Sequence, residues 1–224
     1  MALVACLFLR FDAHEVYRRF PKTNSRHVLI MYQMIKDAHE LFMRDGLLYW
    51  AAAGTLLGAV RHKGLIPWDY DLDIFIRQED EPLLLQLKNE FSSLGYNLVK
   101  KRDFVYFLCK KTAQIPHMDI ILTYQNDDKI FYSCEKLQKK YRREKLPLYF
   151  TEQELYPLQE INFGVCKVIA PINPHPYLYY AYGSDYLTHA ICANNSIKIE
   201  LSEQDKMPAL PLGPLKDRVQ CIKE

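Results

Sequence analysis

This chain of 224 residues lacks three features that would each point to a class of protein. It has little net charge, since 29 Lys and Arg oppose 27 Asp and Glu and leave a formal charge of +2. Non-specific collection of nucleic acid by a strong positive field is therefore excluded. It has no internal repeats or low-complexity tracts, and none of its six cysteines belongs to a C-x-x-C pair or to a zinc-type spacing with histidine. Buried, reduced thiols in a reducing compartment are the favoured interpretation, with long-range disulfides as the alternative.

Long hydrophobic runs are also missing. The apolar stretch near the start, residues 2–9, is far shorter than a bilayer span and is followed at once by Arg10. No basic residues precede it and no clean cleavage site follows it, so a secretory signal is a poor fit. We expect no transmembrane segment and a cytoplasmic protein. If the stretch is a truncated anchor, a Golgi or secretory location is the alternative.

The amino-acid composition is that of a folded globular protein. Apolar residues make up 49% of the chain, charged residues 25% and aromatic residues 13%. The length suits one substantial core. We expect an N-terminal segment over 1–22, one domain over 23–200 and a C-terminal tail over 201–224 that is either a wrapping arm or a loose end.

Hydrophobic periodicity predicts helices and strands in alternation. Ser25 is the expected N-cap of the first helix, and Gly46 is its expected C-cap. The basic segment 135–145 is predicted to be a solvated helix or loop. Its alternative role is to dock an anionic glycan, a lipid surface or a donor. A hairpin turn is predicted at 162–164. The predicted helices cover 25–45, 56–62, 79–94 and the region around 178–182, and the predicted strands cover 47–53, 71–76, 97–101, 104–109, 117–124 and 130–133.

The candidate chemistry begins with a pair of carboxylates. Asp71 and Asp73 are two residues apart in a predicted strand, so both side chains point to the same face. Two like charges at that distance repel, and a divalent cation between them makes the arrangement favourable. Hard oxygen ligands suit Mg²⁺ or Mn²⁺ better than zinc. Asp119, in a later strand that we expect beside the first, is a third candidate ligand because an unpaired buried acid is costly.

The segment before this pair suits a phosphate group. Gly54 allows close approach of the backbone, the hydroxyl of Thr55 can donate a hydrogen bond, and the start of a helix attracts negative charge. Arg61, in the run Arg61–Lys63, adds cationic donors for a diphosphate. Together with the carboxylates these residues predict phosphoryl transfer, in which the protein aligns the reacting groups and a metal takes up the developing charge.

These residues also resemble a known family. The run GTLLGAVRHKGLIPWDYDLDI over 54–74 is similar to the LicD family, which includes bacterial phosphocholine transferases and is related to the fukutin-type ribitol-phosphate transferases. The similarity is tight over this run and looser over 25–190. The resemblance implies an α/β fold with a nucleotidyltransferase-like mixed sheet flanked by helices and a C-terminal helical or loop extension.

The resemblance also implies site residues and substrates. Asp71, Asp73 and Asp119 would be the catalytic metal ligands, and Gly54 and Thr55 the phosphate turn. The implied reaction moves a phospho-alcohol group such as phosphocholine from a CDP-linked donor to a hydroxyl, on a glycan, with Mg²⁺ or Mn²⁺. No nucleic acid partner and no transmembrane segment are expected, whereas peripheral membrane contact stays open. Tyr70 departs from many relatives, which have an acid there.

Several of these residues have a second interpretation. Asp69 either orients a second ion or the acceptor hydroxyl, or caps a turn. Trp68 either packs the loop or stacks on a base or a quaternary ammonium group. Arg61 either contacts phosphate or is a surface charge, and Asp119 is either a base or only a ligand. A calcium loop starting at Asp69 is disfavoured because its sixth and twelfth positions are isoleucine and aspartate.

Two other functions remain as alternatives. The same metal site would serve transfer of a nucleoside monophosphate to the acceptor, and the mass of the product distinguishes the two reactions. A catalytically silent module that binds a nucleotide or a glycan is the non-enzymatic alternative. Three converging carboxylates argue against it, because a silent module has no need of such a costly arrangement.

Overall fold

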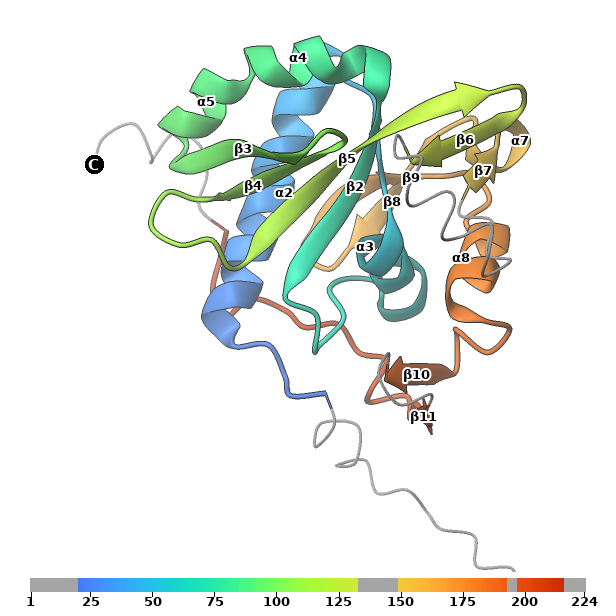
Figure 1. Cartoon of the computed structure of the whole chain (residues 1–224). Coiled ribbons are helices and arrows are strands. Elements are labelled where there is room, and N and C mark those ends of the chain that lie inside the picture. Colours follow the sequence, from blue (N-terminus) through green and yellow to red (C-terminus); the bar gives the residue numbers. More distant parts are fainter. Residues whose placement is uncertain (1–19, 133–148, 193–196, 216–224) are drawn as a thin grey trace, which may run out of the picture.

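A mixed, seven-stranded sheet forms the centre of the computed structural model, which describes residues 20–132, 149–192 and 197–215 (Figure 1). Five strands follow the order β1-β2-β5-β4-β3, and β5 continues through β6 to β7. Strands β2 and β5 are parallel, and the other pairs in the sheet are antiparallel. The strands are β1 (Tyr49–Ala51), β2 (Asp71–Arg77), β3 (Tyr96–Arg102), β4 (Val105–Lys110), β5 (His117–Asn126), β6 (Lys129–Tyr132) and β7 (Tyr149–Thr151).

Helix α2 (Ser25–Asp45) packs across one face of this sheet (Figure 1). Its predicted start is wrong by one residue: the N-cap is Asn24, whose side chain accepts a hydrogen bond from the backbone N–H of His27 at 2.8 Å. An Asx cap satisfies a backbone donor that the first helical turn leaves without a partner. Gly46, with φ +72°, is the left-handed C-cap that the sequence predicts.

The segment predicted as one helix over 79–94 is divided. A 3-10 turn (Gln78–Asp80) leads into α4 (Glu81–Gln86), and α5 (Lys88–Ser93) follows after Leu87. Leu87 has ψ −4°, a turn-like value that interrupts the regular ladder of helical hydrogen bonds. Its side chain is nevertheless buried, so the expected apolar stripe reaches the core.

The opposite face of the sheet is covered near β1 by α3 (Ala53–Leu57) and α8 (His175–Tyr182) (Figure 1). The strand predicted over 47–53 is only Tyr49–Ala51, because helix begins at Ala53. Helix α3 runs directly into a π-helical turn, Gly58–His62, in which the N–H of Lys63 bonds to the carbonyl of Gly58. The helix predicted over 56–62 is therefore an α segment joined to a π segment.

Two hairpins and a short helix complete the described fold. The predicted turn at 162–164 joins β8 (Gln159–Phe163) to β9 (Cys166–Ala170), and α7 spans Glu152–Leu155. Strands β10 (His189–Cys192) and β11 (Ile197–Glu200) form a second hairpin that the sequence pattern does not predict, as is also true of β7. This second hairpin has a small apolar cluster of its own, formed by Ala190, Ile199 and Leu201 with Phe20 and Trp68 against it.

The described part of the C-terminal tail is a wrapping arm. The N–H of Ala209 donates to the carbonyl of Leu65 at 2.9 Å, and the Tyr32 hydroxyl donates to the carbonyl of Ala209 at 2.9 Å. Cys109 and Cys166 are free thiols. None of the described helices has the length and apolarity needed to cross a bilayer. The basic segment 135–145 lies outside the described residues.

Candidate functional site

The predicted carboxylates meet on two neighbouring parallel strands. In the register of β2 and β5, Asp73 is the partner of Asp119 and Asp71 is the partner of His117. Alternation along each strand places Asp71, Asp73 and Asp119 on one face of the sheet. The expectation that the strand of Asp119 lies beside that of the Asp71–Asp73 pair is confirmed. The catalytic and metal-binding roles of the three residues stay predictions.

Asp69 adds a fourth carboxylate to this group. The Thr23 hydroxyl donates to the carbonyl of Asp69 at 2.5 Å, and the N–H of Asp69 donates to the carbonyl of Ile66 at 3.0 Å, so two contacts fix the loop before β2. The carboxyl group of Asp71 lies close enough to raise the pKa of Asp69. Asp69 Oδ1 also accepts a hydrogen bond from the N–H of Tyr70 at 3.1 Å, which is the turn-capping contact considered from the sequence.

The crowding of carboxylates changes their protonation. Burial raises the pKa of Asp73 well above its ordinary value, and the charges of Asp71, Asp69 and Asp119 raise it further. Burial is also the main cause of the raised pKa of Asp69, followed by the charge of Asp71. Like charges close together disfavour ionisation, and a nearby cation reverses that effect. The group is thus electrostatically suited to a positively charged ligand.

The residues fit a divalent metal ion. Asp119 Oδ1 is a buried oxygen that makes no hydrogen bond among the described residues beyond a 3.2 Å ion-pair contact with His117 Nε2, and the surrounding ligands are hard carboxylate oxygens. In the described part of the chain no three acidic, histidine or cysteine side chains are already arranged to hold an ion. Ionised carboxylates repel one another, so a bound cation would have to draw these side chains closer together.

Gly54 lies directly against the carboxylates. Its backbone N–H donates to Asp73 Oδ2 at 3.2 Å. A Cβ atom built on Gly54 would lie 2.5 Å from Asp69 Oδ2 and 3.5 Å from Asp73 Oδ2. A real Cβ does not approach a carboxylate oxygen to 2.5 Å, so only glycine fits this position without movement of Asp69. Gly54 therefore lies against carboxylates, and its close approach to a phosphate stays a prediction.

Thr55 has a different contact from the one expected. Its side chain is 3% exposed, and its hydroxyl accepts a hydrogen bond from the N–H of Asp73 at 2.8 Å. The hydroxyl therefore fixes the backbone of Asp73 from the first turn of α3. Donation to a phosphate by Thr55 stays a prediction, whereas its link to β2 is a feature that the sequence pattern does not reveal.

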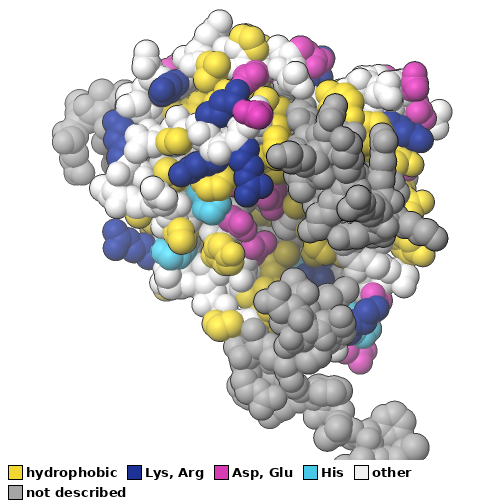
Figure 2. Space-filling view, in the orientation of Figure 1, with side chains coloured by type: hydrophobic (Ala, Val, Ile, Leu, Met, Phe, Trp, Pro, Cys, Tyr) yellow, Lys and Arg dark blue, Asp and Glu magenta, His cyan; other side chains and the backbone are white. Residues whose placement is uncertain are grey.

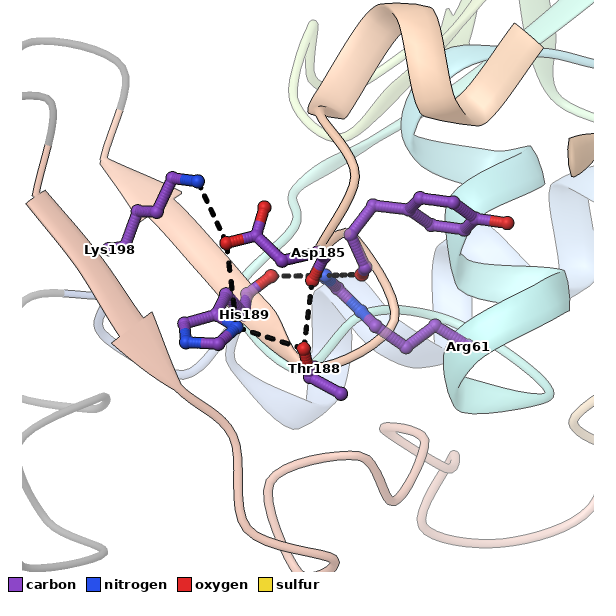
Figure 3. A network of polar contacts seen from close by, with 6 residues as sticks. Arg61, Asp185, Thr188, His189 and Lys198 are labelled. Atoms are coloured by element: carbon purple, nitrogen blue, oxygen red, sulfur yellow. Dashed lines mark hydrogen bonds and ion pairs between the residues drawn. The ribbon is translucent and has the colours of Figure 1, made fainter. Parts of the chain in front are cut away.

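Arg61 is held by backbone carbonyls (Figure 3). Its Nη1 donates to the carbonyl of Tyr186 at 2.7 Å and to that of His189 at 2.8 Å. Burial lowers the pKa of Arg61 to about 10, while the charges of Tyr182 and Asp69 oppose that change. The interpretation of Arg61 as a surface charge is wrong. Arg61 thus stabilises the segment that leads into β10. The predicted phosphate contact would have to use guanidinium nitrogens other than Nη1.

A cavity of about 450 Å³ opens beside three of the carboxylates. Trp68 lines it, stacks on Phe20 with ring centroids 5.5 Å apart, and contacts the edge of His62 at 5.6 Å. Both interpretations of Trp68 from the sequence thus have a basis, since it packs the loop and also faces the cavity. The lining residues are Phe20, Ala53, Gly54, Leu57, Arg61, Ile66, Trp68, Asp69, Tyr70, Asp71, Asp73, Tyr182, His189 and Ala190.

Sequence reasoning missed three neighbours of the carboxylates. His117 Nε2 lies 3.2 Å from Asp119 Oδ1, and the contact with Asp119 raises the pKa of His117. Its position two residues before Asp119 in an alternating strand is a signal that could have identified it. Tyr182 and His189 reach the cavity from the C-terminal part of the chain. Tyr182 ends an aromatic stretch, 177–182, for which the sequence favours core and lid packing over a sugar-binding platform. No local pattern marks His189, because tertiary folding alone brings it to the cavity.

Comparisons with known proteins place this site within a matched region. The sequence profile described as LicD/FKTN/FKRP, nucleotidyltransferase domain, matches residues 46–173. An uncharacterized protein of Rickettsia prowazekii (strain Madrid E) is 36% identical over 213 residues, which are 90% of this chain and 76% of that protein. The solved structure of the lincosamide antibiotic adenylyltransferase LnuA, lincomycin-bound, has a TM-score of 0.41 at 15% identity and covers 78% of this chain and 92% of that chain.

Two characterised proteins are similar over shorter regions. The lipopolysaccharide cholinephosphotransferase LicD of Haemophilus influenzae is 29% identical over 136 residues, or 53% of this chain and 50% of that protein. The ribitol 5-phosphate transferase FKRP of Homo sapiens is 29% identical over 147 residues, or 62% of this chain and 28% of that protein. The chain thus spans half of the first protein and little more than a quarter of the second.

Proposed function

The chain belongs to the LicD/FKTN/FKRP nucleotidyltransferase-domain family, and from this premise we propose that it transfers a phospho-alcohol group from a CDP-linked donor to a hydroxyl of a glycan. The names of two similar proteins specify choline phosphate and ribitol 5-phosphate as the groups moved. Both groups are phosphate esters of small alcohols, and both reactions need a site that stabilises charge on phosphate oxygens.

One observation carries the proposal. Four carboxylates, Asp69, Asp71, Asp73 and Asp119, gather where β2 and β5 begin, and three of them line the cavity together with Gly54. Burying like charges together is unfavourable unless a cation binds them. A divalent ion held by these carboxylates can in turn bind the negative oxygens of a diphosphate. The arrangement therefore supports chemistry on a phosphorylated donor.

Each residue has a role in this proposal. Asp71, Asp73 and Asp119 would hold Mg²⁺ or Mn²⁺, which when bound stabilises the negative charge that develops on phosphate oxygens. Gly54 leaves room for the Asp69 carboxylate and donates its backbone N–H to Asp73 Oδ2, so it holds two of the carboxylates close together. Thr55 holds the N–H of Asp73 and so fixes the strand that carries two of the ligands. Asp69, behind Gly54, is placed to orient the donor.

The proposed reaction is a direct displacement at phosphorus. The oxygen of the acceptor hydroxyl forms a bond to the phosphorus that carries the alcohol. The bond from this phosphorus to the bridging oxygen breaks, and cytidine monophosphate leaves with the electron pair. The hydroxyl proton passes to a carboxylate of the group or to water. The attacking and leaving oxygens must lie in line with the phosphorus. The main task of the protein is therefore to align the donor and the acceptor rather than to activate them chemically.

The cavity walls suit the organic parts of such a donor. Trp68, Phe20 and Tyr182 present aromatic rings near the carboxylates. Aromatic faces bind a quaternary ammonium group through its positive charge and also stack on a pyrimidine base. Both a choline group and a cytosine ring would therefore find a favourable surface. This observation supports the donor class and leaves the choice of alcohol to experiment.

A second reaction is favoured by the description of the family itself, which is a nucleotidyltransferase domain. In that reaction the cytidine monophosphate group would move to the acceptor and the other phosphate would leave. The same carboxylates would serve it. A non-catalytic binding module is less favoured, because the raised pKa of Asp73 reflects a cost that binding alone does not require.

Incubation of the full chain with CDP-choline, CDP-ribitol and UDP-glucose tests the proposal. Each donor is tested with Mg²⁺, with Mn²⁺ and with EDTA, and the release of nucleoside monophosphate is measured. We expect metal-dependent release of cytidine monophosphate from a CDP-linked alcohol, at least slowly to water. Mass spectrometry of an acceptor product that gains a nucleotide would contradict the proposed transfer. Absence of release with every donor and metal would contradict enzymatic activity.

A further inference from the structure

A row of side chains extends from Asp119 toward the edge of the sheet. The ring of Phe107 on β4 stacks on the ring of His117 with centroids 4.3 Å apart, and Lys101 on β3 lies with its Nζ 5.3 Å from the centre of the Phe107 ring. Phe107 is the register partner of both Asp119 and Val99, and Val99 is 40% exposed. We call Lys101, Phe107 and His117 the shelf.

Within the described residues, no helix covers the shelf on its face of the sheet (Figure 1). Helices α2, α4 and α5 lie on the other side, and α3 and α8 cover the region near β1 (Figure 1). Figure 2 shows Lys and Arg side chains gathered over β3 and β4 directly beside acidic side chains near the beginning of β5. A cationic and aromatic surface is therefore continuous with the carboxylates.

Alternation along the edge strand places Lys101 on the same face as Val99, the register partner of Phe107. The register between β3 and β4 shifts between Lys100 and Arg102. Lys100 points to the helical side, where its Nζ lies 2.8 Å from Glu81 Oε1. Within the described residues no carboxylate pairs with Lys101. Lys101 thus stands beside an aromatic ring without a carboxylate partner among the described residues.

The shelf and the cavity lie on different sides of the carboxylates. Asp69, Asp71 and Asp73 line the cavity, whereas Asp119 does not, as far as the described residues show, and its side chain contacts the shelf through His117. In an in-line displacement the attacking and leaving oxygens approach phosphorus from opposite sides. A donor seated in the cavity beside Gly54 therefore leaves the shelf as the direction of attack.

We propose that the shelf is the acceptor subsite and that it selects a sugar carrying a negatively charged substituent such as a phosphate. This inference rests on the proposed function. The ring of Phe107 offers an apolar surface for the face of a sugar, and Lys101 offers a cation for the anionic substituent. A neutral sugar would use only the aromatic part of this surface, so the charge on Lys101 sets the preference.

Binding of glucose 6-phosphate to the full chain tests the shelf. The ¹⁵N-labelled protein is titrated with glucose 6-phosphate, glucose and inorganic phosphate, and backbone signals of Val99, Phe107 and His117 are followed. We expect glucose 6-phosphate to shift these signals most strongly. Lys101→Gln should weaken its binding about tenfold, which corresponds to the loss of one charge-assisted contact, and Lys101→Arg should restore most of the affinity.

Two further variants make the test specific. Lys100→Gln is the matched control, because it removes a neighbouring lysine that faces the other side, and it should change affinity by less than about twofold. Phe107→Leu should weaken the binding of glucose 6-phosphate more than the binding of inorganic phosphate. Equal effects of Lys100→Gln and Lys101→Gln would overturn the proposal. So would signals that respond only to cytidine monophosphate, which would assign the shelf to the donor.

The shelf and the proposed function fail in different ways. Metal-dependent hydrolysis of CDP-choline without any acceptor reports on the carboxylates alone, and the control Lys100→Gln should leave it unchanged. Hydrolysis by the wild-type chain together with unresponsive shelf signals would reject the acceptor subsite and keep the transferase. Responsive shelf signals without hydrolysis of any donor would reject the transferase and reduce the shelf to a sugar-phosphate binding surface.

Discussion

Asp73 and Asp119 are directly paired across the parallel strands β2 and β5. Neighbouring strands lie about 4.8 Å apart, so the two side chains leave the sheet side by side on the same face. Asp119 accordingly contributes to the raised pKa of Asp73, after burial and the charges of Asp71 and Asp69. The backbone register alone thus creates a site of concentrated negative charge, which the side chains cannot leave by changing rotamer.

Asp73→Asn should abolish activity without loss of the fold. The amide keeps the shape and can still accept from the N–H of Gly54, but it removes one negative charge from the proposed metal site. We expect release of cytidine monophosphate to fall roughly a thousandfold, because a metal contributes several kcal/mol of charge stabilisation. Thermal unfolding without metal should be unchanged or occur at a slightly higher temperature, because repulsion decreases.

Asp127→Asn is the matched control for this change. Asp127 lies in the exposed turn between β5 and β6 with φ +54°, a conformation that asparagine tolerates well. The same charge is removed at a distance from the site, so activity should be retained. Full turnover by Asp73→Asn, or an equal loss in Asp127→Asn, would refute the assignment of Asp73.

The free energy of unfolding without metal should decrease as pH rises above 3.8, the ordinary pKa of an aspartate carboxyl group. The raised pKa values of Asp73 and Asp69 mean that the folded state binds these protons more tightly than the unfolded state does. That stabilisation is complete below the unfolded pKa and is lost as pH rises through the folded pKa. Thermal unfolding in EDTA over a pH series measures this change, and Asp73→Asn should reduce it.

Mg²⁺ or Mn²⁺ should reverse that loss. The cation competes with protons for the same oxygens, so the increase in melting temperature on adding metal should be absent near pH 4 and should grow toward neutral pH. A cation that raises the melting temperature equally at both ends of the series would indicate binding elsewhere. Ca²⁺ at the same concentration provides a comparison of ion size.

Gly54→Ala should reduce activity because the new methyl group displaces Asp69. The built Cβ lies 2.5 Å from Asp69 Oδ2, so one of the two groups must move. We expect a loss of about tenfold to a hundredfold, typical of misplacement near the reacting atoms. In an Asp69→Ala background the same change should cost little, because the clash is gone. Purely additive losses in this double-mutant cycle would argue against the contact.

Arg61→Met should loosen the segment before β10. The variant removes the donor to the carbonyls of Tyr186 and His189 and leaves these acceptors without their partner. Loss of buried hydrogen bonds from a charged donor costs about 1.5 to 3 kcal/mol each. Hydrogen exchange should increase most in 186–192, and the KM of the donor should rise more than kcat falls. Unchanged exchange in that segment would contradict the role, and Lys63→Met is the matched control.

The carboxylate pair and the long first helix could be predicted because their signals are local. Alternation fixes the face of Asp71 and Asp73, and Gly46 ends α2 as predicted, whereas the N-cap is Asn24, one residue before the predicted Ser25. The place of Asp119 required a guess about strand order, which the register of β2 and β5 confirms. Each of these features depends on a pattern of a few residues.

The contacts of Arg61 and Thr55 could not be predicted because they depend on distant backbone atoms. Arg61 bonds to carbonyls more than 120 residues further along the chain. The Thr55 hydroxyl accepts a hydrogen bond from the N–H of Asp73 on β2, a strand that packs on α3. The loop that carries Asp69 is likewise fixed by Thr23, whose hydroxyl donates to the Asp69 carbonyl from a separate segment. No spacing in the sequence encodes these partners.

The π-helical turn at Gly58–His62 has a consequence for engineering this chain. A π turn contains one residue more than the α-helical turn that would close the same loop. Deleting Ala59 would shorten this turn by one residue and force the residues left in it, Arg61 among them, into new angular positions. Arg61 would then be aimed away from the carbonyls that it binds. Chimeras that exchange α3 for a regular helix should therefore carry the extra residue with them.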